Sequence, residues 1–357
     1  GDLNPRSNPQ VRQYLYGQLG LKAMFGGSSA DEDALIRLTI RYPEWKQLLL
    51  DICEYRSAAL IKATFLDSVP KRIEADGRLY GRIMLHGTAT GRFATRDPNT
   101  QNWPVALREM VVASLGNILF GGDASQLEER LMAYASGCRS KLKALEHGVD
   151  LHAQDAASIF GVPISTITKK APLRVLIKGF KYALAYGAGV DKIYIELLKS
   201  DELRALGIEI THDDVRRWYE VYKQLHPEIF VWAERMYGQA IRDRRVDTAY
   251  GRCRLLFGPD TTLRGIAFNT PIQGSAADYL NDVLIRLWLQ EERAWVWRDN
   301  AWLFNQSHDS LTGEAKSEYA QEAAMILQQA AEQPVTMFGQ TFVVPFETKV
   351  GATWKEV

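Results

Sequence analysis

The chain has 357 residues, 46% of them hydrophobic, which is enough for a folded protein of two or three lobes. Equal numbers of basic and acidic residues, 43 each, exclude the strongly basic surface of a small nucleic-acid-binding module, so any site for a polyanion must be local. Three widely separated cysteines, no apolar signal segment and no run of 18 apolar residues indicate a protein of a reducing compartment with no membrane partner. The expected location is the cytoplasm or another intracellular site such as the nucleoid, and a viral or organellar origin stays open.

Helical and strand patterns follow one another in an order that predicts an α+β fold with a large helical insertion. Two helical stretches come first, then a segment rich in turn formers, then a short apolar strand that leads into a helix. The middle is almost entirely helical, with helix caps expected at Asp150 and Thr211, and the C-terminal third combines one long helix with strands. The ranges are 9–20 and 43–66 (helices), 78–104 (turns), 118–120 (strand), 150–239 (helices), 273–298 (helix), and 301–307, 311–314 and 341–350 (strands).

The segment from Pro172 to Gly187 is predicted to form one amphipathic helix. Its basic residues fall within about 60° of one another, and two tyrosines continue that stripe at four-residue steps. The stripe consists of Arg174, Lys178, Lys181, Tyr182 and Tyr186, and the opposite, apolar face of Leu173, Leu176, Ile177, Phe180 and Leu184. A solvated basic face is the ordinary explanation of such a helix, and a phosphate-binding face is the alternative.

Two aspartates, Asp123 and Asp309, each follow an apolar strand. Their ordinary roles would be a helix N-cap and a hairpin turn, respectively. If adjacent strands of one sheet carry them, the two carboxylates repel unless a cation lies between them, and Mg²⁺ prefers such oxygen ligands. A basic helix together with paired aspartates predicts a site of phosphoryl transfer.

Several segments, spread in order over nearly the whole chain, resemble the polymerase domain of family A (Pol I-like) DNA polymerases. The segments are 123–130 (DASQLEER, motif A), 174–187 (RVLIKGFKYALAYG, motif B), 308–310 (HDS, motif C), 88–92 with 97–102 (TATGR, DPNTQN), 150–152 (DLH) and 269–278 (NTPIQGSAAD). The resemblance implies a right-hand polymerase fold, in which an antiparallel palm sheet carries a large helical fingers insertion. It divides the chain into a thumb remnant or helical scaffold (1–75), a first palm segment (76–140), fingers (141–262) and a second palm segment (263–357).

The resemblance also implies a role for each motif residue. Asp123, Asp309 and the carbonyl of Ala124 would hold two Mg²⁺ ions, for which Mn²⁺ is the alternative, and Lys178 would donate a proton to the leaving pyrophosphate. The implied nucleotide-binding residues are Arg174, Lys178, Tyr182, Tyr186, His152, Glu128 and Gln126. Those implied to contact primer and template are Arg92, Asn99, Gln101, Asn102, Gln273, His308 and Arg130.

Two of these residues are implied to select the nucleotide. Glu128 would fill the space that a 2′-hydroxyl needs, which favours deoxynucleotides. Tyr182 stands where many family members have phenylalanine, and its hydroxyl would favour the use of dideoxynucleotides.

The sequence departs from the family pattern at two places. Motif C usually ends in glutamate, whereas position 310 is serine, which removes one carboxylate from the implied metal site. Phage-type single-subunit RNA polymerases resemble this His-Asp-Ser and work with two aspartates. In addition, the first residues resemble the sequence just after the helical hairpin of the thumb. Three explanations stay open: the chain is a fragment, one part of a split polymerase, or a small enzyme that binds DNA weakly.

The expected function is template-directed DNA synthesis without a proofreading exonuclease in this chain. The expected partners are a DNA primer-template, dNTPs, and a missing N-terminal segment, a separate subunit or a processivity factor. The alternatives are an RNA polymerase or reverse transcriptase of the same fold and a catalytically impaired DNA-binding scaffold.

Overall fold

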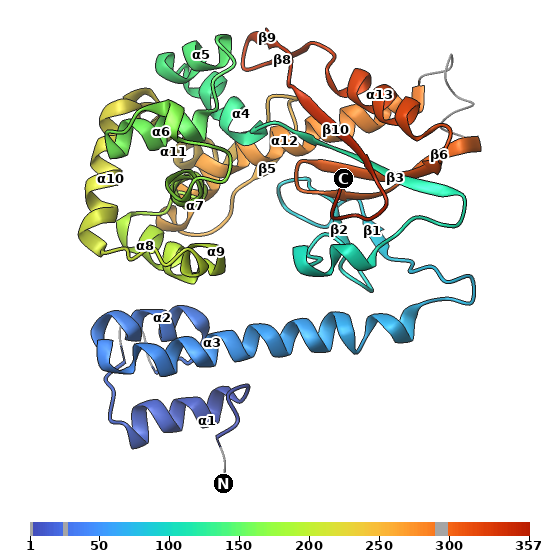
Figure 1. The fold of residues 1–357 in the computed structure, drawn as a ribbon. Helices are drawn as coiled ribbons and strands as arrows, with labels where there is room; N and C mark the ends of the chain where they lie inside the picture. The colour runs from blue at the N-terminus through green and yellow to red at the C-terminus, as the bar shows by residue number, and fades with distance from the viewer. Residues whose placement is uncertain (1–2, 24–27, 290–298) are drawn as a thin grey trace. The chain divides into compact units, whose positions relative to one another are not determined.

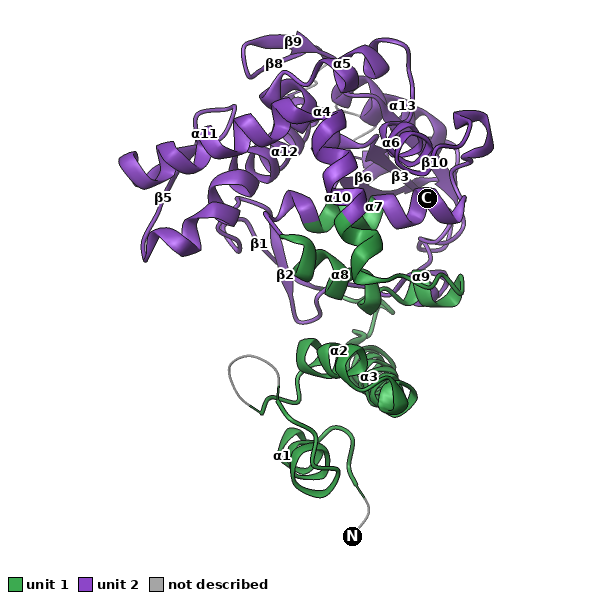
Figure 2. Cartoon of the chain, turned by 90° about the vertical axis from the view of Figure 1, so that its left-hand side faces the viewer, with its two compact units in different colours: residues 1–80, 178–183, 189–216 green, residues 81–177, 184–188, 217–357 purple. Residues whose placement is uncertain are grey.

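The computed structural model describes residues 3–23, 28–289 and 299–357, and these residues form helices and antiparallel sheets. They divide into two compact units, shown in green and purple in Figure 2. Unit 1 comprises residues 1–80, 178–183 and 189–216, and unit 2 comprises residues 81–177, 184–188 and 217–357. The observed fold is therefore α+β, as the sequence predicts. Among the described residues, no helix is both long and apolar enough to cross a membrane.

Unit 1 is helical. Its helices are α1 (Asn8–Arg12), α2 (Glu32–Arg41), α3 (Lys46–Ile61), α8 (Val190–Lys199) and α9 (Asp201–Ala205). Leu15, Leu35, Leu49 and Ile195 belong to one buried cluster, so α8 shares a core with the first helices of the chain. The predicted helical stretches 9–20 and 43–66 are confirmed, because α1 and α3 are each extended by wider helical turns, over Gln13–Gln18 and Lys62–Leu66.

Unit 2 is built around a four-stranded antiparallel sheet in the order β10-β3-β7-β6 (Figure 1). Its strands are β3 (Asn117–Ala124), β6 (Ala301–Ser307), β7 (Ser310–Lys316) and β10 (Phe346–Gly351). Helix α13 (Ala320–Ala331) packs on β3 and β10. The middle residues of β3, from Leu119 to Gly122, are all buried, which indicates a strand covered on both faces.

Helices and three small hairpins complete unit 2. The helices are α4 (Leu127–Ser136), α5 (Arg139–Glu146), α6 (Leu151–Phe160), α11 (Pro227–Asp243) and α12 (Leu263–Leu289), while residues of α7 (Pro172–Ala185) and α10 (His212–Leu225) belong to both units. The hairpins are β1 (Arg82–Met84) with β2 (Ala94–Arg96), β4 (Arg245–Asp247) with β5 (Cys253–Leu255), and β8 (Val335–Met337) with β9 (Gln340–Phe342).

The predicted helix caps are confirmed. The Asp150 side chain accepts hydrogen bonds from the first turn of α6, and the Thr211 hydroxyl exchanges hydrogen bonds with Asp214.

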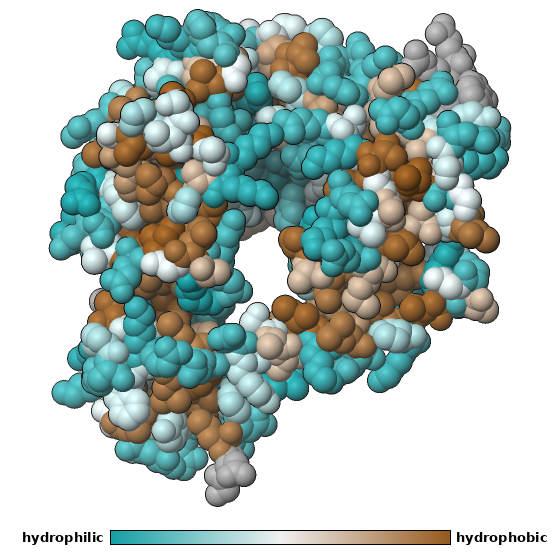
Figure 3. Space-filling view, in the orientation of Figure 1, coloured by the Kyte–Doolittle hydropathy of each residue, from teal (hydrophilic) through white to brown (hydrophobic). Residues whose placement is uncertain are grey.

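Exposed hydrophobic side chains gather on the surface over β1, β2 and the segment that follows them (Figure 3). They are Ile83, Leu85, Val105, Met110 and Val112. These residues therefore contribute little to the core of unit 2, which is built around the sheet and α12.

Three predicted boundaries are wrong. Strand 118–120 continues to Ala124, because the whole of β3 pairs with β7 and β10. Helix α12 begins at Leu263 rather than at 273 and includes Pro271, because burial of its middle turns outweighs the lost backbone hydrogen bond. The predicted end at 298 lies outside the described residues. Strand 341–350 is split into β9 and β10 by Pro345, which has no N–H to donate.

Gly122 offers a test of how tightly the sheet is packed beside Asp123. A Cβ at position 122 would lie 2.2 Å from Phe346 Cε1 and 2.9 Å from Thr348 Cγ2. We expect Gly122→Ala to lower the free energy of unfolding by about 1–3 kcal/mol, the usual cost of overpacking, in a denaturant titration. In α11, a Cβ at Gly238 meets nothing within 4 Å, so Gly238→Ala is the control and should leave stability unchanged or raise it by up to about 1 kcal/mol. Equal effects of the two substitutions would contradict the packing described for β3.

Candidate functional site

The pairing of β3 with β7 brings Asp123, near the end of β3, beside Asp309, in the hairpin turn just before β7. Asp123 pairs with Ser310 of β7 and with Glu347 of β10, and the Ala124 N–H donates to the Asp309 carbonyl at 3.0 Å. This confirms the predicted adjacency of Asp123 and Asp309 in one sheet. The N-cap explanation of Asp123 is wrong, because Asp123 lies within β3 and Gln126 occupies the N-cap position of α4, without a side-chain hydrogen bond to the helix.

Asp309 lies in a tight turn between β6 and β7. His308, the first residue of this turn, has a left-handed φ of 51°. Desolvation and the positive charges of Arg92 and Arg108 lower the pKa of His308, so its ring is neutral at neutral pH. The turn is closed by Ser310, whose hydroxyl donates to the Ser307 carbonyl at 2.8 Å.

Arg92 lies between the carboxylates of Glu128 and Asp309, two of the predicted site residues. Its Nη2 lies 2.5 Å from Glu128 Oε1 and 3.5 Å from Asp309 Oδ1. The side chains of Arg92, Glu128 and Asp309 are 18%, 18% and 24% exposed, respectively, so the pairs are largely shielded from bulk water. The guanidinium therefore balances two negative charges that would otherwise repel each other.

The aspartates provide a donor set that fits a hard divalent cation. In the part of the chain that the structure describes, no group of three or more His, Cys, Asp or Glu side chains is arranged to hold a metal. Mg²⁺ does not need such a group, since one or two carboxylates commonly hold it together with water and substrate phosphates. The hydroxyl of Ser310 is engaged within the turn, so Asp123 and Asp309 are the predicted motif residues whose carboxylates could meet such a cation here.

The segment that precedes the sheet uses several of its predicted DNA-contacting side chains internally. Asn99 Oδ1 accepts from the backbone N–H groups of Gln101 and Asn102 at 3.1 and 3.3 Å. Gln101 Nε2 donates to the carbonyls of Phe93 and Gln306, both at 2.9 Å. These bonds attach the segment to β6 and leave Asn102 as the exposed residue of the three.

Gln273 connects α12 to the end of α7. It is buried, and its Nε2 donates to the hydroxyl of Tyr186 at 2.6 Å. The tyrosine ring itself is 41% exposed. This bond holds Tyr186 in place while the ring stays accessible.

Asp150 links the starts of α6 and α7. Its Oδ1 accepts from the N–H groups of His152 and Ala153, and its Oδ2 accepts from Arg174 at 2.7 Å. Burial opposes ionisation of Asp150, but these hydrogen bonds outweigh it and lower the pKa of the carboxyl. Arg174 is therefore held by a carboxylate and by the Lys169 carbonyl, while His152 is buried with only 8% of its surface exposed.

The start of α4 is fixed by two predicted site residues. Gln126 has a left-handed φ of 51°, and its Oε1 accepts from the Leu151 N–H at 2.9 Å. Arg130 Nε donates to the Ser125 carbonyl at 2.8 Å, and burial lowers the pKa of its guanidinium. Both side chains thus hold the turn that follows Asp123.

Helix α7 confirms most of the predicted amphipathic pattern. Leu176, Ile177, Phe180 and Leu184 are buried, and Lys178 and Tyr182 are exposed. The placement of Lys181 on the exposed stripe is wrong, because Lys181 is 3% exposed: its position borders the apolar face. Lys178 and Tyr182 belong to unit 1, whereas the paired aspartates belong to unit 2.

A buried ion cluster, which the sequence did not predict, fixes the helices that carry Glu128 and His152. Lys141 of α5 has no exposed surface, and its Nζ lies 2.9 Å from both Glu129 of α4 and Asp155 of α6. Desolvation opposes its charge, but the two carboxylates raise the pKa of Lys141 well above its usual value. The second oxygen of Asp155, Oδ1, lies 2.7 Å from His226 Nε2.

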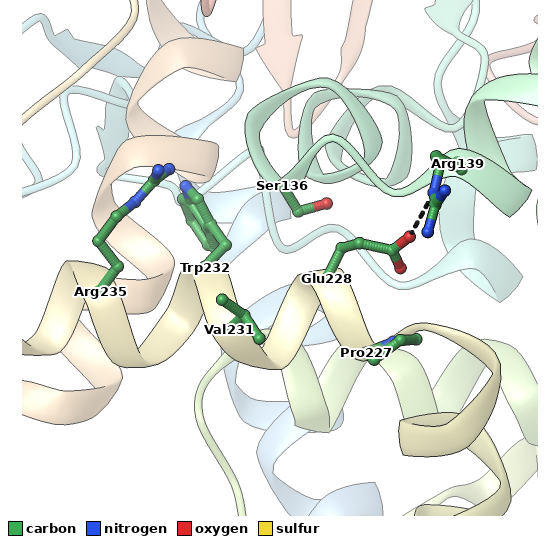
Figure 4. Close-up of a pocket in the computed structure, with 7 residues that line it drawn as sticks. All are labelled: Ser136, Arg139, Pro227, Glu228, Val231, Trp232 and Arg235. Carbon is green, nitrogen blue, oxygen red and sulfur yellow. Dashed lines mark hydrogen bonds and ion pairs between the residues drawn. The ribbon is translucent and has the colours of Figure 1, made fainter.

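A separate pocket opens between the end of α4, the start of α5 and α11 (Figure 4). Its lining residues are Ser136, Arg139, Pro227, Glu228, Val231, Trp232 and Arg235. Figure 4 shows Arg139 pointing to Glu228, with which it forms an ion pair at 3.3 Å. The pocket includes none of the predicted site residues.

The antiparallel sheet with adjacent aspartates, together with the helical insertion between β3 and β6, defines a right-hand polymerase domain. The sequence model of DNA polymerase family A matches residues 1–356. The chain therefore belongs to DNA polymerase family A.

Individual relatives agree with this assignment. The thermostable DNA polymerase I of Thermus aquaticus is 28% identical over 367 residues, covering 98% of this chain and 41% of the relative. DNA polymerase I of Caldicellulosiruptor bescii is 30% identical over 372 residues, covering 99% of this chain and 41% of the relative. This chain thus spans about two-fifths of the length of these curated relatives.

A solved structure shares the fold. It is the POL domain of Pol1 from M. smegmatis in complex with DNA primer-template and dNTP. The TM-score is 0.81 at 25% identity, and the alignment covers 99% of this chain and 62% of the other. The right-hand architecture is therefore shared over nearly the whole of this chain.

Lys141 provides a test of the buried ion cluster. We expect Lys141→Met to lower the free energy of unfolding by about 3–5 kcal/mol, because Glu129 and Asp155 would keep buried charges without their cation. Lys143→Met is the control on the same helix, since Lys143 is exposed, and its effect should stay within about 0.5 kcal/mol. The measurement is urea unfolding followed by circular dichroism, and a loss below about 1 kcal/mol for Lys141→Met would contradict the described cluster.

Proposed function

We propose that this chain catalyses template-directed DNA synthesis, adding deoxynucleotides to a primer 3′-hydroxyl. The observation that supports the proposal is the placement of Asp123, in β3, beside Asp309, in the turn just before the adjacent strand β7, in a family A fold. The M. smegmatis relative, which is described as a complex with DNA primer-template and dNTP, supports the choice of substrates. A further subunit or processivity factor stays a prediction.

Asp123 and Asp309, with the Ala124 carbonyl, would hold the divalent ions of the site. When bound, Mg²⁺ would supply Lewis-acid activation of the 3′-hydroxyl and neutralise charge on the leaving pyrophosphate. In the reaction, the primer 3′-oxygen forms a bond to the α-phosphorus while the bond from that phosphorus to the pyrophosphate oxygen breaks. The hydroxyl proton passes to solvent, and Lys178 would donate a proton to the departing pyrophosphate.

The remaining residues would hold and select the nucleotide. Arg174, braced by Asp150, and Lys178 would bind the phosphates, with Gln126 and His152 supporting the turn and helix beside them. Tyr182 and Tyr186 would contact the sugar and the bases through their exposed rings. Glu128, held by Arg92 at 2.5 Å, is a fixed rather than a mobile obstacle, which suits its proposed exclusion of a 2′-hydroxyl.

Residues of the sheet and of α12 would hold the primer and template. Asn102 is exposed, and His308 stays neutral, so both can donate or accept hydrogen bonds at the DNA surface. Arg92, Gln273 and Arg130 would contact sugars, phosphates or minor-groove edges, while Asn99 and Gln101 shape the segment that presents Asn102. Contacts of this kind position DNA without reading its sequence.

The proposal is tested by primer extension with Asp309→Asn. We expect extension to fall by more than about 100-fold, the scale of removing one electrostatic group from a preorganised site. Asp213→Asn removes an exposed carboxylate of α10, so this control should extend primers like the wild type. Unchanged extension by Asp309→Asn would remove this aspartate from the catalytic site.

The same assay separates the alternatives. A preference for ribonucleotides would indicate an RNA polymerase, and efficient copying of an RNA template would indicate a reverse transcriptase. A wild-type chain that binds primer-template without extending it would be a scaffold. The geometry favours deoxynucleotides, because Glu128 is fixed by Arg92.

Tyr182→Phe tests the role of the tyrosine hydroxyl. We expect the use of dideoxynucleotides relative to deoxynucleotides to fall by about 5-fold, because one hydrogen bond worth about 1 kcal/mol would be lost. Tyr55→Phe is the control, because the exposed fractions of Tyr55 and Tyr182 are similar at 52% and 54%. The measurement is the incorporation ratio in single-nucleotide extension, and an unchanged ratio in Tyr182→Phe would end this interpretation.

A further inference from the structure

Arg252 joins three segments of unit 2 that lie far apart in the sequence. Its Nη2 donates to the carbonyls of Thr90 and Gly274 at 2.6 and 3.2 Å, and its Nε donates to Asp278 Oδ1 at 2.8 Å. Thr90 precedes β2, whereas Gly274 and Asp278 are residues of α12. A single guanidinium, on the residue just before β5, thus holds the β1–β2 loop against α12.

Two glycines make room for this guanidinium. Gly91 has a φ of +83°, and a Cβ there would lie 2.5 Å from Arg252 Cζ. A Cβ at Gly274 would lie 3.1 Å from Arg252 Nη2 and 2.6 Å from Thr248 Cγ2. The close approach of two backbones to one side chain indicates a built contact rather than an incidental one.

Asp278 makes the contact depend on a cation. Its side chain is only 11% exposed, and within the described residues its buried Oδ2 has no hydrogen-bond partner. Arg252 therefore provides the positive charge that compensates this buried carboxylate. Lysine could pair with Asp278, but it lacks the planar set of donors that reaches two carbonyls at the same time.

The two anchored carbonyls flank the residues proposed to contact DNA. Thr90 lies two residues before Arg92, whose guanidinium is 2.5 Å from Glu128 and 3.5 Å from Asp309. Gly274 directly follows Gln273, which holds the hydroxyl of Tyr186. The hydrogen bonds of Arg252 described above end on the β1–β2 loop and on α12, so its effect on Arg92 would pass through the backbone.

We infer that Arg252 is a positioning residue that fixes Arg92 and Gln273 relative to each other for binding of the primer-template. The inference rests on the proposed function, because it assigns these two residues to DNA. Weakening the hydrogen bonds of Arg252 should weaken DNA binding and slow the chemical step, because both depend on the position of Arg92. Arg252 itself is not expected to contact the reacting atoms.

The test is primer-template binding by the whole chain with Arg252→Lys, measured by fluorescence anisotropy of a labelled duplex. We expect the Kd to rise by about 10-fold and the single-turnover extension rate to fall by a similar factor, since one residue is displaced without being removed. Arg245→Lys is the matched control in the same hairpin, because Arg245 is exposed and pairs locally with Asp247, and it should change neither quantity.

A double-mutant cycle distinguishes positioning from general destabilisation. If Arg252 acts through Arg92, the effect of Arg252→Lys on Kd should largely disappear in an Arg92→Ala background. An effect that stays the same in that background would overturn the inference. Asp278→Asn keeps the shape of the side chain that pairs with Arg252 but removes its charge. We therefore expect the Kd to rise by a smaller factor, about 3-fold, with the same dependence on Arg92.

Three further outcomes separate this inference from the proposed function. A wild-type chain that binds DNA without extending it would contradict the proposed function, and the binding cycle would still decide the role of Arg252. Normal extension and normal Kd in Arg252→Lys would overturn the inference and leave the proposed function intact. A wild-type chain that binds no primer-template would overturn both.

Discussion

The backbone pairing of β3 with β7 is the constraint on which the rest of unit 2 depends. These strands are separated by the whole helical insertion, yet their register sets Asp123 opposite Ser310 and brings Ala124 to the carbonyl of Asp309. A shift of one residue would turn Asp123 to the other face of the sheet. Glycines at positions 122 and 313 keep this region closely packed, since a side chain at either would collide with its neighbours.

Arginine side chains organise the carboxylates around this sheet. Arg92 bridges Glu128 and Asp309, Arg174 holds Asp150, and Arg252 compensates Asp278. Each places a planar group with several donors beside a carboxylate and, for the last two, beside backbone carbonyls as well. The acidic residues of the site are thus held by partners whose charge does not change with pH in the physiological range.

Features set by local pattern and motif order could be predicted from the sequence, whereas features set by tertiary contacts could not. Capping residues and periodicity determine the caps at Asp150 and Thr211 and the buried face of α7, and the adjacency of the two aspartates follows from the apolar strands before them. Lys141, in contrast, resembles an ordinary surface lysine until α4 and α6 bury it between two carboxylates. Lys181 sits at the border of two helix faces, where a small rotation decides its burial. Arg252 carries no motif of its own, although the glycines that it approaches are visible in the sequence.

The balanced charge of the chain has a consequence for how a polyanion arrives. With 43 basic and 43 acidic residues, the whole chain has no formal net charge, and Arg92 is already paired with Glu128 and Asp309. Electrostatic steering, which speeds the encounter of oppositely charged partners, therefore contributes little over long distances. A nucleic acid would meet this surface at an ordinary diffusional rate, and its retention would depend on contacts formed after the encounter by exchanging one ionic partner for another.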